Sequence, residues 1–92
     1  DPDHPPTIDL FQNFPNPFNP KSAIRFQVSA SDNVTLSVYD LLGREVAVLV
    51  DRSLGPGTYE AEFNASGLPS GAYFYRLRAG SLTATKKMLL IR

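Results

Sequence analysis

The chain has 92 residues, of which 42% are hydrophobic and 11% aromatic, and this composition predicts one ordered domain with a modest core rather than a disordered chain. Nine basic and nine acidic residues cancel, so no net charge draws the chain toward nucleic acid or an anionic membrane. The absence of cysteine excludes disulfides, thiolate catalysis and cysteine-based metal sites.

The sequence also indicates the context of this domain. Its longest purely apolar run, residues 46–50, is far too short to cross a bilayer as a helix, so we expect no membrane insertion. The chain starts with Asp1 and its single methionine is Met88, so we expect a fragment from the C-terminal end of a larger secreted protein. Residues 1–7 contain three prolines and predict the end of an interdomain linker, with the domain spanning residues 8–92.

The first part of the domain predicts a short strand followed by a shaped loop. The strand is expected at residues 8–12. Residues 13–20 contain three prolines, which cannot donate backbone hydrogen bonds to a sheet. Phe14 and Phe18 in this loop are strongly apolar, and we expect both to plug one end of the core.

The middle of the chain alternates apolar and polar side chains, as half-buried strands do. This pattern predicts strands at residues 24–28 and 34–39, followed by a tight turn in which Gly43 takes a positive φ. The next strand is predicted at residues 44–50. Its inner face is expected to consist of Val46, Val48 and Val50.

The last third of the chain predicts strands at residues 58–64, 72–79 and 82–91. No segment has an apolar repeat of helical period and length. Strands with turns every 8–12 residues or so predict an all-β fold, an immunoglobulin-like antiparallel β-sandwich of about seven strands. A Leu-Pro pair ahead of Tyr73 resembles a tyrosine corner, in which a phenol hydroxyl secures an arch between sheets.

Potential catalytic groups are isolated in the sequence. His4 lies in the predicted linker without a serine or aspartate partner. Glu60 and Glu62 share one strand face about 7 Å apart, a spacing compatible with a glycosidase pair but equally with a solvated strand. We therefore predict that the domain is not an enzyme.

Candidate ligand sites are equally sparse. Asp32 and Asn33 lack the alternating acidic pattern of a calcium loop, so we predict no metal and no cofactor. Asn33 and Asn64 begin glycosylation triplets, which are common by chance. Phe74 remains a candidate for stacking on a sugar, whereas alternation directs Tyr73 and Tyr75 into the core.

The final strand has apolar side chains on both faces near its end. Met88 and Leu90 fall on one face and Leu89 and Ile91 on the other, so one row cannot be buried in a single core. We expect that row to remain accessible. We also expect the strand edge to accept another strand through main-chain hydrogen bonds.

Four blocks of sequence together resemble one known family. The type A C-terminal sorting domain of the bacterial type IX secretion system is similar in residues 12–20, 38–46, 68–77 and 85–90, and the similarity extends from Leu10 to Arg92. The Asn-Pro-Phe-Asn-Pro and Tyr-Asp-x-x-Gly-Arg blocks are also similar to the immunoglobulin-like domain of flagellar hook-capping scaffolds. The Trp-Asp-Gly turn usual in that group is absent, because residues 63–68 contain no tryptophan.

The resemblance implies a non-catalytic domain at the end of a secreted enzyme or adhesin. It implies recognition by the outer-membrane type IX machinery and a sorting peptidase, and export through the periplasm of a diderm bacterium to the medium or the cell surface. The domain is expected to be monomeric, with an upstream catalytic domain in the same protein. The alternative is a carbohydrate-binding or structural accessory module.

The candidate recognition residues lie in the proline-rich loop and in the final strand. They are Asn13, Pro15, Asn16, Pro17, Phe18, Lys86, Lys87, Met88, Leu89 and Leu90.

Overall fold

Seven antiparallel strands make up the regular structure of residues 5–92, the part of the chain that the computed structural model describes. The strands are β1 (Ile8–Leu10), β2 (Lys21–Val28), β3 (Asp32–Tyr39), β4 (Glu45–Leu54), β5 (Gly57–Asn64), β6 (Gly71–Ala79) and β7 (Leu82–Leu90). His4 lies outside the described residues.

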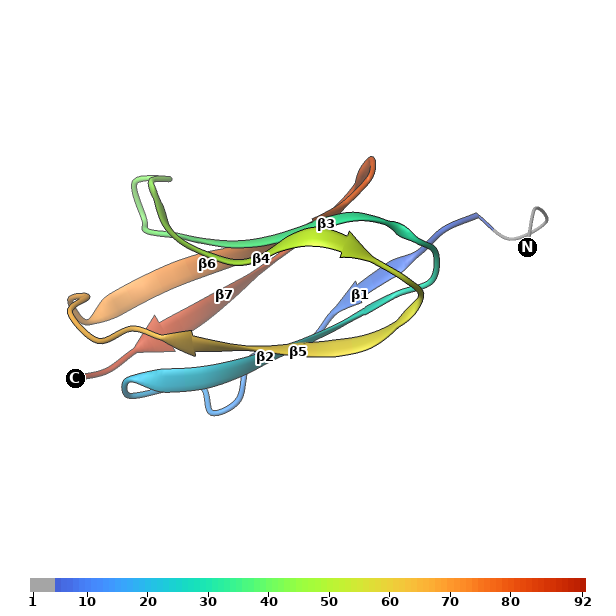
Figure 1. Cartoon of the computed structure of the whole chain (residues 1–92). Helices are drawn as coiled ribbons and strands as arrows, with labels where there is room; N and C mark the ends of the chain where they lie inside the picture. The colour runs from blue at the N-terminus through green and yellow to red at the C-terminus, as the bar shows by residue number, and fades with distance from the viewer. Residues whose placement is uncertain (1–4) are drawn as a thin grey trace.

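The strands form two sheets that face each other (Figure 1). One sheet has the order β1-β2-β5 and the other the order β4-β3-β6-β7. As a result β4 and β5 run along one edge of the sandwich, and β1 and β7 run along the other. The predicted all-β, immunoglobulin-like sandwich of about seven strands is confirmed.

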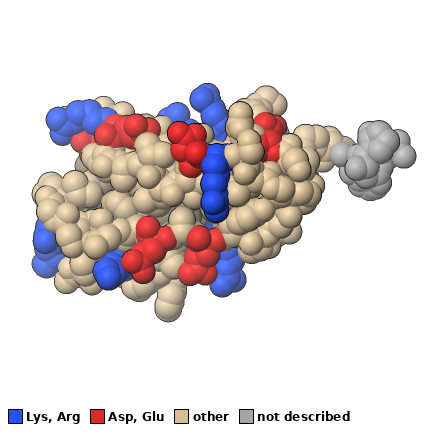
Figure 2. Space-filling model, viewed as in Figure 1, with Lys and Arg blue, Asp and Glu red and all other residues tan. Residues whose placement is uncertain are grey.

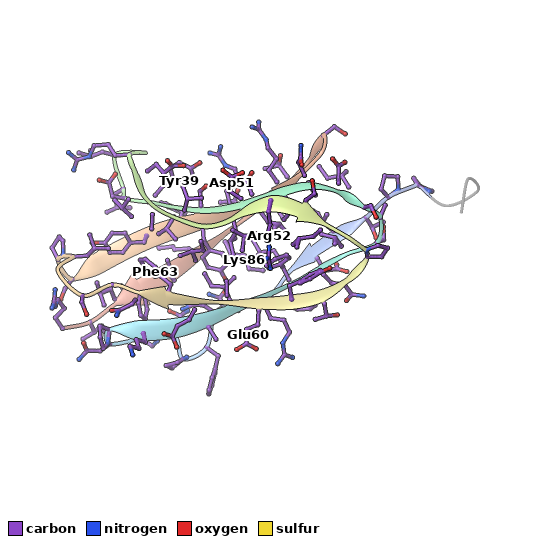
Figure 3. All side chains as sticks on the ribbon, in the orientation of Figure 1. Tyr39, Asp51, Arg52, Glu60, Phe63 and Lys86 are labelled. Atoms are coloured by element: carbon purple, nitrogen blue, oxygen red, sulfur yellow. The ribbon has the colours of Figure 1, made fainter. Side chains whose placement is uncertain are left out.

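The core lies between the two sheets because alternate side chains of each strand point inward. On β2, Ile24 and Phe26 are buried while Arg25 is exposed. Figure 3 shows Phe63 and Lys86 in the layer between the ribbons, with Glu60 outside the three-stranded sheet. The largest fully buried side chains are Tyr75, Phe26, Phe63, Ile24, Leu36, Leu77, Met88, Leu90, Val34 and Val38.

Strand β4 departs from the predicted alternation. Its register against β3 shifts twice, between Leu36 and Ser37 and again between Val38 and Tyr39, as expected for β-bulges. The bulges change the facing of the residues that follow, so Val48 is 49% exposed while Leu49 packs against the core. The prediction that Val48 belongs to the inner face is therefore wrong.

Two tyrosines secure arches at opposite ends of the sandwich. The Tyr73 hydroxyl donates to the carbonyl oxygen of Pro69 at 2.6 Å, which confirms the predicted tyrosine corner. The Tyr59 hydroxyl makes the same contact four residues back, with the carbonyl oxygen of Gly55 at 2.7 Å. Each hydrogen bond thereby ties a strand to the turn that precedes it, β6 in the case of Tyr73 and β5 in the case of Tyr59.

Candidate functional site

Residues 11–20, named here the proline strap, connect the two sheets at one end of the sandwich. The strap first continues along β2, where the backbones of Phe14 and Ala23 exchange hydrogen bonds of 2.9 Å in both directions. It then crosses to β7, and Phe18 forms a parallel bridge with Leu90. A loop that carries three prolines thus still pairs with a strand at each of its ends.

Phe14 and Phe18, the two strap phenylalanines expected in the core, have opposite environments. Phe18 is 2% exposed and packs on Phe63, with ring centroids 5.9 Å apart, as predicted for a core plug. Phe14 is 79% exposed, so the prediction that it also plugs the core is wrong. The reason is geometric: Phe14 pairs with β2 as an extension of β1, and its side chain falls on the solvent side of the sheet.

A buried tyrosine hydroxyl anchors the strap to β6. Tyr75 Oη accepts a hydrogen bond of 2.9 Å from the Asn13 backbone N–H and donates one of 2.7 Å to the Phe11 carbonyl oxygen. Burial raises the pKa of Tyr75, and the hydrogen bond from Asn13 opposes that rise. The alternation of β6 predicted that Tyr75 points inward, and a buried hydroxyl needs partners.

Asn13 extends this anchor into a small polar network. Its Nδ2 donates to Ser22 Oγ at 2.8 Å and to the Pro15 carbonyl oxygen at 3.1 Å, and its Oδ1 accepts from Gln12 Nε2 at 2.7 Å. Asn13 is only 2% exposed. Its side chain therefore shapes the strap from inside and is not presented to a partner.

The strap covers the edge of β7 near its C-terminal end. Gln12 Nε2 donates to the Lys87 carbonyl oxygen at 2.8 Å, and Asn16 Oδ1 accepts from Leu89 N–H at 3.0 Å. Phe18 closes the pairing: its N–H donates to the Leu89 carbonyl oxygen, and its carbonyl accepts from Ile91 N–H, both at 3.0 Å.

This stretch of β7 is therefore already paired. The expectation that it accepts an incoming strand is wrong for Leu89 and Ile91, because the strap occupies the positions where that strand would bind. The expected apolar row is accessible, with Leu89 40% and Ile91 50% exposed, while Met88 and Leu90 are buried.

The structure brings the two predicted recognition segments together. Their side chains differ in exposure to solvent. Those with buried side chains are Asn13, Phe18, Met88 and Leu90. Those exposed are Pro15, Asn16, Pro17, Lys87 and Leu89. Lys86 is half-buried in the inward-facing row of β7, opposite Tyr75. The surface around the strap and the end of β7, formed by the exposed residues, is named here the strap surface.

A second surface feature is a groove of about 490 Å³ between the β3–β4 hairpin and residues 68–73. Asp40 organises the hairpin: its carboxylate accepts from the Arg44 and Leu42 backbone N–H groups at 3.0 and 2.9 Å. The hydrogen bond from the Arg44 backbone holds the pKa of Asp40 below its usual 3.8. Gly43, with φ +82°, allows the chain to reverse, as predicted.

Asp32, Glu60 and Glu62, the acidic residues considered above as possible sites, are exposed to solvent. Glu60 is paired with Arg25 across the outer face of β2 and β5 at 3.8 Å. In the part of the chain that the structure describes, no three His, Cys, Asp or Glu side chains gather as a metal site would require. No helix long and apolar enough to cross a membrane occurs among residues 5–92.

Sequence comparison identifies the family. Over residues 12–91 the chain matches the secretion system C-terminal sorting domain. The protein therefore belongs to this family, the C-terminal sorting domains of type IX secretion. No curated protein sequence matches the chain.

Structural comparison supports the fold. The chain is similar to part of a solved structure, "Crystal structure of dimeric latent PorU from Porphyromonas gingivalis", with a TM-score of 0.70 and 22% identity. The match covers 96% of this chain and 10% of that one, so the chain spans about a tenth of that protein's length.

Proposed function

We propose that this chain is the sorting signal of a longer secreted protein, an enzyme or adhesin joined before residue 8, and that it directs this cargo across the outer membrane to the cell surface. The family match over residues 12–91 carries the proposal. The type IX machinery and its sorting peptidase are the proposed partners, and the domain itself performs no reaction. Residues 1–7 are the proposed linker.

The strap surface is the proposed contact with that machinery. Its support is the convergence of two segments more than 60 residues apart in the sequence, joined by four hydrogen bonds between residues 12–18 and 87–91. Such a surface exists only after folding, because neither segment alone contains it. A receptor that binds it selects the folded domain over an unfolded chain.

The test is export of a folded reporter fused in front of the chain, in a host with type IX secretion. Wild-type chain is expected to place the reporter outside the cell, and a fusion without the chain to leave it in the periplasm. Equal export of both fusions would refute the proposal.

A point variant tests the strap surface. Lys87→Ala removes an exposed side chain and is expected to reduce export several-fold, whereas Lys21→Ala, which removes an exposed lysine of β2, should have little effect. Lys86 is a poorer choice because its stem lies in the half-buried inward row. Full export of a Lys87→Ala fusion would exclude this side chain from the contact.

A hollow beside the strap supports the second candidate function, carbohydrate binding. Phe11 and Phe14, both exposed, line a hollow of about 390 Å³ that also includes the Arg25–Glu60 pair. Exposed aromatic faces with charged hydrogen-bonding neighbours suit a sugar ring. Retention of the domain on a polysaccharide matrix, lost in Phe14→Ala while export persists, would establish this function. Phe74, the earlier candidate, is half-buried.

A further inference from the structure

The neutral chain is strongly segregated in charge. No acidic residue follows Glu62 in the sequence. The basic residues after it are Arg76, Arg78, Lys86, Lys87 and Arg92. The cancellation of charge over the whole chain therefore hides a basic C-terminal third, which folds into the neighbouring strands β6 and β7.

The fold places most acidic and basic residues on different strands, although Glu45 and Asp51 of β4 share the outer face of the four-stranded sheet with the arginines of β6. Strands β4 and β5, on one edge of the sandwich, contain one basic residue, Arg52, and four acidic ones: Glu45, Asp51, Glu60 and Glu62. Figure 2 views this edge and shows acidic side chains on both sheets there. Strands β6 and β7 contain four basic residues and no acidic one.

Three of these basic side chains share the outer face of the four-stranded sheet. Arg76 and Arg78 alternate with the buried residues of β6 and are exposed, and Lys87 lies opposite Phe74 in the same row. Glu45 lines the same hollow as Arg76 and Arg78, but within the described residues no carboxylate lies within 4 Å of Arg76, Arg78 or Lys87. By contrast, Arg25 on the other outer face is paired with Glu60.

Apolar and aromatic groups lie among these charges. The Arg76 guanidinium sits 4.8 Å from the centroid of the Tyr39 ring, which holds its orientation by a cation–π contact. Phe74 neighbours Tyr39 in the register, and Leu89 is exposed on the same face. Arginine combined with Tyr and Phe is typical of the centre of a protein–protein interface.

We propose that this face, built from Arg76, Arg78 and Lys87 around Phe74 and Leu89, docks onto an acidic surface of a partner protein. The inference rests on the proposed sorting function and specifies the chemistry of the receptor. A protein fits better than a membrane, because basic segments that bind anionic lipid usually carry roughly four to eight clustered cations. The unpaired arginines also favour carboxylates, which they bind in bidentate geometry.

The test uses the reporter fusion with Arg76→Glu and Arg78→Glu together. We expect export to fall at least about tenfold, because like charges then face each other across the interface. Arg76→Lys with Arg78→Lys keeps the charge and should retain most of the export. Lys21→Glu is the control, since it reverses an exposed charge on β2 of the other sheet and should export normally.

Circular dichroism and thermal melting show whether each variant is folded. If the double variant is unfolded, the single variant Arg78→Glu replaces it in the export test. Normal export of a folded charge-reversal variant would overturn the inference while leaving the sorting function intact. Failure of the wild-type fusion to leave the cell would instead refute the sorting function itself.

A second measurement separates a protein partner from a lipid one. The purified fusion is mixed with vesicles of phosphatidylglycerol and phosphatidylcholine and separated by flotation. We expect the fraction of protein that floats with the vesicles to be the same for the wild type and the double variant. Strong flotation of wild type that is lost in the double variant would assign the face to the membrane and overturn the proposal.

Discussion

The Tyr75 hydroxyl both accepts and donates a hydrogen bond inside the fold, so Tyr75→Phe leaves the Asn13 N–H and the Phe11 carbonyl without their partner. We expect a loss of about 1–3 kcal/mol in the free energy of unfolding, measured by urea titration. Tyr39→Phe is the control, because the Tyr39 hydroxyl has no hydrogen bond among the described residues. A similar loss in both variants would contradict the anchoring role.

The raised pKa of Tyr75 adds a pH dependence. The unfolded chain ionises near the ordinary tyrosine value of 10.0, before the native state does. The contribution of Tyr75 to stability is therefore complete below pH 10 and decreases as pH rises from there through the native pKa. We expect the melting temperature to fall more steeply above pH 10 in wild type than in Tyr75→Phe.

The lowered pKa of Asp40 predicts that the stability of the domain decreases as the pH falls into the acidic range. The contribution of Asp40 is present above about pH 3.8 and is lost as pH falls through the lower native value. Asp40→Asn should therefore weaken the domain at pH 7 and converge with wild type in strong acid. Parallel melting curves from pH 7 to pH 2 would show that the hairpin carboxylate does not contribute.

Among the elements, the strap and the end of β7 give the most direct test. Asn16→Ala removes the acceptor of the Leu89 N–H, while the Ile91 N–H keeps its bond to Phe18. We expect faster hydrogen exchange at Leu89 than in wild type, with Ile91 nearly unchanged, and a stability loss of about 1 kcal/mol or less. Equal acceleration at both amides would indicate that the whole strap had detached.

Regular strands were predictable because alternation and burial agree in them. The inward residues of β6, Tyr73, Tyr75 and Leu77, were assigned correctly, as were the two faces at the end of β7. On β4 the same rule failed at Val48, since the bulges depend on pairing with β3 and leave no local signature in the sequence.

The strap surface was predictable only as two separate segments. The sequence indicated that the proline-rich loop and the final strand were unusual, but the hydrogen bonds between them join residues over 70 positions apart. Alternation along β6 places Arg76 and Arg78 on the outward face, as the structure has them, but the segregation of charge along the chain was missed because only the total charge was considered. The signal was present, since no acidic residue follows Glu62.

For the whole molecule we expect a metal-independent, helix-poor fold. The described residues contain only strands as regular structure, and their hydrogen bonds satisfy every buried side-chain nitrogen and oxygen. The far-ultraviolet circular dichroism spectrum should show a β signal, and adding a chelator should leave the melting temperature unchanged. A fall of several degrees with chelator would reveal a bound ion that stabilises the domain.

The elongated shape has a consequence for what the domain can carry. It measures 46 Å along its longest axis and 23 and 18 Å across. β1 begins toward one end of that axis, and the C-terminus lies at the other, where Phe18 holds Ile91 (Figure 1). A protein joined ahead of β1 would therefore be separated from the C-terminal end by most of the length of the domain. Under the proposed sorting function, this distance would leave the C-terminal end of the domain accessible whatever the size of the attached protein.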